Sequence, residues 1–560
     1  MEKNWQIKEA NPALQSHFSQ NLNIDPIIAQ LLINRGILEI DAAKRFLSAA
    51  LSTLYDPFLL KDMDKAIARI KQARAHNERV LIFGDYDVDG VVSTALLHAM
   101  LTDFGLDVIN FIPHRIEQGY GLNHEIADFA KEKNVSLIIT IDCGITACGE
   151  VDTINKLGID VIIIDHHEPP DDGLPQALAI VNPKQKDCAY PFDYLASAGL
   201  VMKLYQALFG KVNEDYLDMV AIATIADIAP LQSENRIFVK HGLPRINVTK
   251  NKGLLALLDV AQIKNKSLSP YHIGFMLGPR INAAGRMDTA HTSLDLFLTD
   301  DTVEALRLAQ QLDRHNGDRQ RMQQNIVEEA FAIIEGDEGL RGQKVIVVSK
   351  EGWHEGLVGI VASKIKDKYY RPAIVMAIKD GVAVASARSV NGFHLQEALS
   401  KCGHCLENFG GHAGAAGLTI KEENIDTFRL LINEFAQDIL VAEKLTPSLS
   451  IDCELPLSEL NLNLVERVNA LAPFGEGNPT PVFCTQNVRV FSAPQTLGKN
   501  TLKFWVSDGP FVFSAVGFGM GELKNQIQKG QSLDIAYELG IDDWNKAPAV
   551  QIVLKDIRLK

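Results

Sequence analysis

The stretch LIFGDYDVDG, residues 81–90, decides the fold and raises the main question about this protein. Four residues without a charge precede Asp85, Asp87 and Asp89, which alternate with Tyr86 and Val88. In an extended chain this alternation places all three carboxylates on one side. Like charges on one face destabilise a structure, so a functional site that needs them has to offset their repulsion.

The pattern around this stretch recurs from residue 80 to about residue 230. Short apolar runs alternate with helix-like segments, in the order VLIFGDYD, DVINFIP, VSLIITIDCG and IDVIIIDHH, before the helical LDMVAIATIADIAPL. Fully apolar runs separated by amphipathic stretches predict a parallel sheet that is covered on both faces. In such an open sheet, functional groups gather beyond the carboxyl ends of the strands.

Three further segments also carry side chains that commonly bind metals, at or after the end of an apolar run. LIITIDCG and VIIIDHH each end on such residues, and IATIADIAP carries one more. The order of the strands would bring together the side chains at the strand ends, and Asp227 would lie on a helix or at its end. The side chains concerned are Asp87, Asp89, Asp142, Asp165, His166, His167 and Asp227. One such placement could be a cap or a buried polar group, but four of them predict a shared site.

Two other interpretations of DYDVDG compete with a metal site. The segment fits the first six positions of an EF-hand calcium loop, with Ser93 at the ninth. The twelfth position requires Glu but holds Leu96, and the preceding segment is strand-like, so the EF-hand is rejected. A solvated acidic loop is the usual fate of a short charge run, and only the recurrence described above argues against it.

The donor set indicates which metal the site would bind. Carboxylates mixed with imidazoles suit Mn²⁺, or Mg²⁺ in a less nitrogen-rich arrangement, and the lack of thiolates argues against structural zinc. The ligands are too many for one ion. Two ions about 3.5–4 Å apart suit phosphoester hydrolysis, because they generate hydroxide and stabilise the attacking and leaving oxygens. Asp142 is central in the chain order, so we predict that it bridges the two ions.

The rest of the chain predicts a multidomain α/β protein of 560 residues. A long helical segment over 302–335 precedes a second strand–helix series. After about residue 450, five short strands suit a small barrel such as an OB-fold. The expected units are an N-terminal helical segment at 1–50, a parallel-sheet domain at 51–305, a connecting helix at 306–336, a second α/β domain at 337–442 and the barrel at 443–560.

Composition limits the possible classes of protein. A hydrophobic fraction of 46% with 22% charged residues is typical of a globular protein. The net charge of −15 gives no hint of nucleic-acid binding, although acids that hold metal are neutralised by it. The start MEKNWQIKEANPAL shows no secretory signal, no run approaches a membrane span, and seven irregularly spaced cysteines predict reduced thiols in the cytoplasm. Cys402 and Cys405 form the one pair that suggests zinc or redox chemistry, and packed thiols are the favoured alternative.

With these residues in hand, the chain resembles the DHH phosphoesterase superfamily, and within it the bacterial exonucleases specific for single strands. DYDVDG, IDCG, the DHH at 165–167 and ADIAPL look like its four motifs. The similarity continues through GPRINAAGRM (278–287), GWHEGLVGIVASKI (352–365), SARS (386–389), GGHAGAAG (410–417) and LAPFGEGNPTPVF (471–483). It covers nearly the whole chain in order. Val88 stands where alanine is common in the family, which is a neutral exchange.

The resemblance implies a DHH domain, a DHHA1 domain and an OB-fold, and it implies roles for the site residues. The implied metal ligands are Asp87, Asp89, Asp142, His166, His167 and Asp227, with Asp85 in or beside the shell and Asp142, His167 and Asp85 as catalytic groups. Asp165 would orient a histidine. The implied activity is processive, metal-dependent degradation of single-stranded DNA from the 5′ end to 5′-mononucleotides, in DNA repair and recombination. Implied partners are a single-stranded-DNA-binding protein and a RecQ-type helicase, with a monomeric enzyme and no membrane.

Contacts with the substrate are also implied by the family motifs. Arginine offers forked donors that suit phosphate oxygens, although a salt bridge is the alternative for any single arginine. Tyr120 could stack on a base or pack in a core. In the barrel, Lys503, Phe504 and Trp505 fit a strand that binds single strands by charge and stacking. The expected substrate-binding residues are Arg115, Tyr120, Arg280, Asn282, Arg286, Ser386, Arg388 and His412.

Two rival functions remain at this point. A nanoRNA or cyclic-dinucleotide phosphodiesterase resembles the two α/β domains but lacks the N-terminal segment and the PFGEGNPTP barrel. A non-catalytic scaffold, as in a eukaryotic helicase subunit related to this family, has lost metal ligands. The intact ligand set argues against the scaffold.

Overall fold

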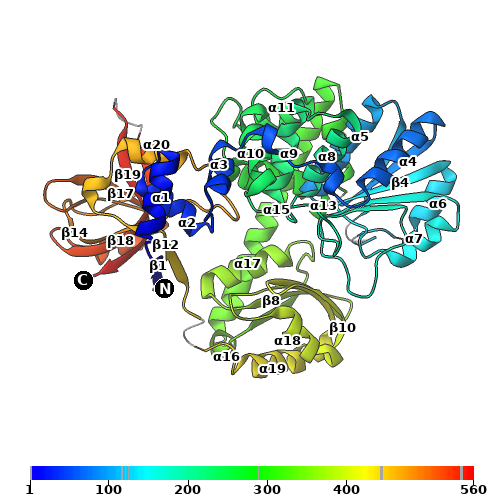
Figure 1. Ribbon diagram of the computed structural model, residues 1–560. Coiled ribbons are helices and arrows are strands. Elements are labelled where there is room, and N and C mark those ends of the chain that lie inside the picture. The colour runs from blue at the N-terminus through cyan, green and yellow to red at the C-terminus, as the bar shows by residue number, and fades with distance from the viewer. Residues whose placement is uncertain are drawn as a thin grey trace.

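The computed structural model describes residues 3–114, 118–119, 121–123, 125–287, 289–441, 445–542 and 547–560. Figure 1 shows three bodies: a large α/β body, a smaller α/β body below it and a β-rich body on the left that holds both chain termini. The long helix α15 (Thr302–Gly336) runs between the two α/β bodies and contains the predicted connecting segment 306–336. No helix in the described ranges has the length and apolar character required to cross a bilayer.

The large body is built on a five-stranded parallel sheet in the order β3-β2-β4-β5-β6. Four of these strands are the apolar runs that predicted them, and β6 is an additional short strand. Because β2, β4 and β5 are neighbours, the loops that follow them share one edge of the sheet. The strands are β2 (Arg79–Gly84), β3 (Asp107–Phe111), β4 (Val135–Ile141), β5 (Asp160–Ile164) and β6 (Ala179–Val181).

Different helices bury the two faces of this sheet. Alternate strand residues such as Val80 and Ile82 share a core with α4 (Met63–Ala75), α5 (Val88–Asp103) and α8 (Ser197–Phe209). Leu81 and Phe83 point the other way and pack with α6 (Glu125–Glu132) and α7 (Cys148–Asn155). This double coverage explains why the strands are continuously apolar rather than alternating.

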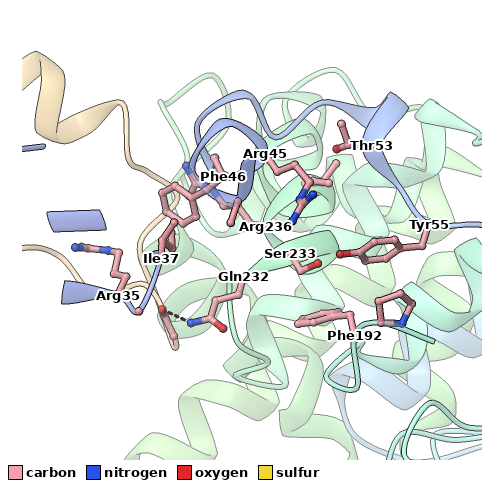
Figure 2. A pocket seen from close by; sticks show the side chains of 15 residues that line it. Arg35, Ile37, Arg45, Phe46, Thr53, Tyr55, Phe192, Gln232, Ser233 and Arg236 are labelled. Carbon is pink, nitrogen blue, oxygen red and sulfur yellow. Dashed lines mark hydrogen bonds between the residues drawn. The ribbon is translucent and has the colours of Figure 1, made fainter. Parts of the chain in front are cut away.

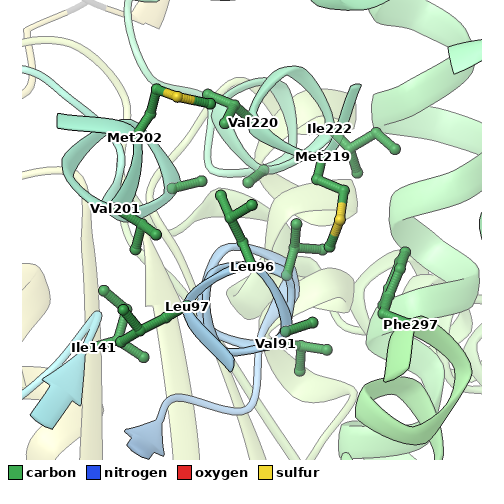
Figure 3. Packing of buried hydrophobic residues seen from close by; sticks show 14 of the residues in the cluster. Val91, Leu96, Leu97, Ile141, Val201, Met202, Met219, Val220, Ile222 and Phe297 are labelled. Carbon is green, nitrogen blue, oxygen red and sulfur yellow. The ribbon is translucent and has the colours of Figure 1, made fainter. Parts of the chain in front are cut away.

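A further helical layer covers α5 and α8. Figure 3 shows Leu96 of α5 directed toward Val201 of α8 and Val220 of α9, and Leu97 directed toward Ile141 of β4. The helices of this layer are α9 (Leu217–Ala226), α10 (Ser233–Ile246), α11 (Lys252–Val260), α12 (Pro270–His272), η4 (Ile273–Leu277), α13 (Gly278–Met287) and α14 (His291–Leu298). Helix α15 follows, and Asp301 caps it by accepting hydrogen bonds from the amides of Val303 and Glu304.

The smaller α/β body has a mixed sheet in the order β10-β11-β9-β8-β7. Only β7 and β8 are parallel, and the glycine-rich GGHAGAAG segment covers the end of β10, the turn after it and the start of β11. The elements are α16 (Glu338–Gly342), β7 (Ile346–Glu351), α17 (Val358–Tyr369), β8 (Ala373–Lys379), β9 (Val382–Arg388), α18 (Leu395–Lys401), β10 (Leu406–Gly411), β11 (Ala415–Lys421) and α19 (Ile425–Ala436). Cys402 and Cys405 are buried in its core, and burial raises the pKa of Cys402 to about 11. A raised pKa is typical of an unreactive thiol packed in a core, which was the favoured alternative.

The β-rich body contains a closed barrel. The five predicted strands close through the pairings β14–β18, β18–β19, β19–β17, β17–β16 and β16–β14. They are β14 (Phe483–Val490), β16 (Thr501–Ser507), β17 (Val512–Phe518), β18 (Ser532–Asp542) and β19 (Ala549–Leu559), to which β13 (Cys453–Glu454) and β15 (Gln495–Leu497) add short edges. Closure of the five long strands leaves the short strands β13 and β15 at the ends of the sheet.

The N-terminal segment packs on this barrel. The sequence predicts helix over 1–50, and the structure adds a strand, β1 (Asn4–Ile7), that pairs in parallel with β12 (Ser448–Ile451). The helices are α1 (Pro12–Leu22), α2 (Pro26–Asn34) and α3 (Ile40–Ser48). Phe18 and Leu31 share one hydrophobic core with Phe483 of the barrel and with α20 (Leu462–Asn469). A single core therefore includes the two ends of the chain.

Candidate metal centre

Acidic and imidazole side chains converge at the carboxyl edge of the parallel sheet. Asp85 and Asp87 follow β2, and Asp87 caps α5 by accepting a hydrogen bond of 3.1 Å from the Gly90 amide. Asp142 follows β4, and Asp227 is the C-cap of α9. The remaining members of the cluster are Asp89 in the first turn of α5, and Asp165, His166 and His167 after β5. Loops after adjacent parallel strands lie side by side, which explains the convergence.

His166 lies between two of the carboxylates. Its Nε2 is 3.1 Å from Asp142 Oδ1, and its Nδ1 is 3.8 Å from Asp227 Oδ2. Potential ligand atoms fall into three groups, each within 4.8 Å: Asp142, His166 and His167; Asp89, His166 and Asp227; and Asp85, Asp87 and Asp142. Asp142 and His166 each belong to two groups. The overlap suits two cations that share Asp142, and that bridge stays a prediction.

Helix α8 holds two of these carboxylates in place. The Ser197 and Ala198 amides donate hydrogen bonds of 2.7 and 3.0 Å to Asp89, and the Ser197 hydroxyl donates one of 2.8 Å to Asp142. The first amides of a helix carry its positive dipole end, so they offset part of the repulsion between the acids. Sequence reasoning missed Ser197. The only signal was a helix start rich in small residues, LASAGL, far along the chain from the aspartates.

Burial and mutual repulsion raise the pKa values of the carboxylates. Burial is the main cause at Asp89 and Asp142, and neighbouring aspartates add to it at both. The same two causes raise the pKa of Asp227 to about 7. Divalent cations would hold these groups ionised, because the positive charge favours the carboxylate form.

The donor chemistry fits Mn²⁺ or Mg²⁺. The three groups of potential ligands offer only carboxylate oxygens and imidazole nitrogens. Cys143 is the nearest thiol in sequence, but burial raises its pKa well above the usual value and its Sγ donates to the Ile141 carbonyl. The described residues of the cluster therefore match the metal predicted from the sequence.

Asp165 orients His167 rather than joining the three groups. Its Oδ1 accepts hydrogen bonds from His167 Nδ1 at 2.7 Å and from the His167 amide at 3.1 Å, and its Oδ2 accepts one from the Ile145 amide. Burial opposes the charged imidazole, yet the hydrogen bond and charge of Asp165 raise the pKa of His167 to about 8. With Nδ1 committed to Asp165, Nε2 is the nitrogen that His167 would present to a metal.

We expect Asp165→Asn to weaken Mn²⁺ binding by about 10–100-fold, because an amide fixes and polarises the His167 ring less strongly than a carboxylate does. Calorimetric titration of the metal-free protein with Mn²⁺ measures the affinity. Asp172→Asn, on an exposed residue shortly after the DHH segment, is the matched control. Equal affinities for the two variants would contradict the orienting role.

Two predicted phosphate contacts lie together in the smaller body. Ser386 and Arg388 on β9 face Gly359 at the start of α17, where an added Cβ would stand 3.3 Å from Ser386 Oγ and 3.1 Å from Arg388 Nη2. Their side chains therefore lie against a helix N-terminus, which favours anions. Arg286 donates from Nη1 to the Gly356 carbonyl at 3.0 Å and so joins α13 to the same segment.

The other predicted substrate residues have different surroundings. Arg280 forms an ion pair of 2.9 Å with Asp313 on α15 and donates to the Met276 carbonyl, which is the salt-bridge alternative raised by the sequence. Asn282 is half-buried in α13, and His412 is exposed between β10 and β11. Arg115 and Tyr120 lie outside the described residues. In the barrel, Phe504 is buried and Trp505 is exposed.

Family models match three parts of the chain. The N-terminal domain of the DHH family matches residues 79–224, the DHHA1 domain matches 342–438 and the RecJ OB domain matches 451–556. These matches define a protein of the DHH class with an appended OB domain, as the sequence motifs indicated.

Individual relatives narrow this class. The single-stranded-DNA-specific exonuclease RecJ of Bacillus subtilis (strain 168) is 39% identical over 99% of this chain and 70% of its own length. The crystal structure of RecJ in complex with Mn²⁺ from Thermus thermophilus matches with a TM-score of 0.86 at 28% identity, over 100% of this chain and 80% of that chain. The Mg²⁺ complex of RecJ from the same organism matches with a TM-score of 0.79 at 26% identity, over 100% and 78%. The chain belongs to the RecJ family.

Proposed function

We propose that this protein is an exonuclease specific for single-stranded DNA that uses two divalent cations, Mn²⁺ or Mg²⁺. The observation that carries the proposal is the set of three ligand groups that overlap at Asp142 and His166. Relatives named as single-stranded-DNA-specific exonucleases, and relatives solved with Mn²⁺ and Mg²⁺, support it.

The residues of the metal centre have distinct tasks in this proposal. Those that would hold the cations are Asp87, Asp89, Asp142, His166, His167 and Asp227, with Asp85 beside them. When bound, two cations supply an activated water and positive charge for a phosphodiester. Asp165 holds the His167 ring, and the start of α8 holds Asp89 and Asp142. This preorganisation places the donors before substrate arrives.

We assign the 5′ polarity to the smaller α/β body. Ser386, Arg388 and the N-terminus of α17 form an anion site that suits a terminal phosphate, since arginine and helix amides both favour phosphate oxygens. The bond from Arg286 to Gly356 keeps this body against the large one. A terminal phosphate held there would leave the adjacent phosphodiester for hydrolysis, with release of 5′-mononucleotides.

The barrel would hold the strand behind the terminus. Trp505 is 43% exposed on β16, and an exposed aromatic ring stacks on any base. Work in DNA repair and recombination, cooperation with a single-stranded-DNA-binding protein and a RecQ-type helicase, and a monomeric state rest on the family resemblance. A cytoplasmic location is supported by seven free cysteines.

An end-labelled digestion tests the function. Single-stranded DNA of about thirty nucleotides, longer than the footprint of one OB-fold, is labelled at the 5′ end and digested with Mn²⁺. Labelled mononucleotide is expected first, and EDTA is expected to stop the reaction. A 3′-labelled strand is the control, from which label should appear last.

Three outcomes would contradict the proposal. Early release of label from the 3′ end would reverse the polarity. Faster cleavage of dinucleotides than of the long strand would favour the dinucleotide phosphodiesterase. Cleavage that persists in EDTA would remove the role of the metal centre.

A further inference from the structure

A pocket that is separate from the metal centre lies where three parts of the chain meet. Figure 2 shows the blue N-terminal segment, the green helices of the large body and the orange C-terminal chain converging around it. Its volume is about 340 Å³. The lining includes Arg45 and Phe46 from the N-terminal segment, Ser233 and Arg236 from the large body, and Gly477 from the segment before β14.

The lining is positively charged. Three of its fifteen residues are arginines, and none is Asp or Glu. The guanidinium of Arg35 points away from the pocket and donates to Asn478 and Pro479, so the charges of the cavity are those of Arg45 and Arg236. The whole chain has a net charge of −15, so this composition is opposite to that of the molecule. No carboxylate in the described ranges forms an ion pair with Arg45 or Arg236. A cavity with cations and no internal counter-ion attracts an anion.

Arg236 is the clearest sign of a missing partner. Its side chain is 1% exposed, its Nε donates to the Phe46 carbonyl at 3.0 Å and its Nη1 donates to the Leu471 carbonyl at 2.8 Å. Within the described residues, no atom accepts a hydrogen bond from Nη2. Burial, together with the nearby Arg35, lowers the pKa of Arg236 to about 10. The Phe46 ring, whose centre lies 3.9 Å from the guanidinium carbon, stabilises this buried charge without neutralising it, and a bound anion would supply the opposite charge.

The start of α10 adds a second anion-binding element to the same cavity. Gln232 is the N-cap of α10 and makes no side-chain capping bond, and both Gln232 and Ser233 line the pocket. Amides in the first turn of a helix have no partner inside the helix and carry its positive dipole end. Figure 2 shows the hydroxyl groups of Ser233 and Tyr55 turned toward each other in the pocket.

We propose that this pocket binds a small anion that bears a phosphate group. The phosphate lies at Arg236, Arg45 and the first turn of α10, and the rings of Phe46, Tyr55 and Phe192 border the remaining space. About 340 Å³ is at the lower end of small-ligand sites, which suits a mononucleotide or free phosphate and excludes a long strand. The inference does not depend on nuclease activity.

Occupation of the pocket would strengthen a junction near the metal centre. Arg236 already ties the N-terminal segment to the large body and to the chain at Leu471. The segment after Asp227 binds the same C-terminal chain, through a bond of 2.7 Å from the Leu231 amide to the Glu476 carbonyl. A ligand that binds only the assembled junction stabilises it.

Calorimetry on the full chain in EDTA tests the proposal, with inorganic phosphate, deoxyadenosine monophosphate and the uncharged nucleoside as separate probes. Arg45→Gln is expected to weaken phosphate or nucleotide binding by at least about tenfold, because a charge-assisted hydrogen bond is lost. Lys44→Gln, the same change on the preceding residue of α3 and outside the lining, is expected to bind as the parent does. Arg45 is exposed, so its variant keeps the fold.

Binding is also measured in an Arg388→Ala variant, so that binding to the pocket is distinguished from binding at Ser386 and Arg388. Binding that persists there and is weakened by adding Arg45→Gln supports the pocket. Equal affinities for phosphate and nucleotide would show that the pocket recognises the phosphate group alone. A higher affinity for the nucleotide would show that the pocket also contacts the nucleoside. No binding by either probe, binding abolished by Arg388→Ala, or equal affinities for Arg45→Gln and Lys44→Gln would overturn the proposal.

Discussion

Asp142→Ala is expected to lower the rate of single-stranded DNA cleavage by at least about a thousandfold, because the variant lacks the carboxylate that we propose as the shared ligand of both cations. Asp142 belongs to two of the three ligand groups, and its Oδ1 also lies 3.1 Å from His166. The same variant should therefore bind less than one Mn²⁺ at a concentration that saturates the parent with two. Single-turnover cleavage and metal analysis after equilibrium dialysis measure the two effects.

The control for this variant is Asp152→Ala, which removes an exposed aspartate of α7 in the same domain. It should leave both the rate and the metal content unchanged. Two intact Mn²⁺ sites in Asp142→Ala would show that Asp142 is no bridge. Unchanged cleavage by Asp142→Ala would show that the measured activity does not come from this metal centre, as expected if a contaminating nuclease accompanied a non-catalytic scaffold.

Lys203→Met is expected to lower the free energy of unfolding of the large body by about 3–5 kcal/mol. Both side chains of the Lys203–Glu234 pair are buried, and Nζ lies 3.0 Å from Oε1. Glu234 also accepts hydrogen bonds from the Tyr55 amide and the Tyr190 hydroxyl. Removal of the lysine leaves a carboxylate buried without a counter-charge, and burial of an unpaired charge is the main cost. Denaturant unfolding followed by circular dichroism measures the loss.

Lys250→Met provides a matched control, because Lys250 is 80% exposed in its pair with Asp215. Its effect should stay below about 1 kcal/mol, the usual limit for a surface ion pair. The double variant Lys203→Met with Glu234→Gln should be more stable than the sum of the single losses predicts. Additive losses would show that the two side chains do not interact.

Much of the metal centre could be predicted because its residues follow directly on recognisable strands. Asp85, Asp142 and Asp165 each come after a continuous apolar run, and parallel topology alone places such positions at one edge. Asp227 was predicted at a helix or its end, and it is the C-cap of α9. The five barrel strands were also predictable, because each is a separate apolar stretch between turns.

Other features depend on contacts that no local pattern encodes. Ser197 reaches Asp89 and Asp142 only because α8 packs on the sheet, more than fifty residues from either aspartate. The ion pair of Arg280 with Asp313 depends on how α13 meets α15. Strand β1 (Asn4–Ile7) is four residues long, and it pairs with β12 (Ser448–Ile451), which is far from it in the sequence. Such pairings are set by tertiary packing rather than by propensity.

The shared core of the N-terminal helices and the barrel has a consequence for mobility. Phe18 and Leu31 pack in the same core as Phe483, and the Trp5 indole donates to Asp556. A fragment that starts at residue 443 would therefore expose the apolar surface that α1 and α2 normally cover. The barrel is also tethered at two points, through the chain that leaves α3 and the chain that leaves α19. Two connections restrict the rotation of the barrel more than a single connection would. A strand held by the barrel would therefore approach the metal centre in a nearly constant orientation.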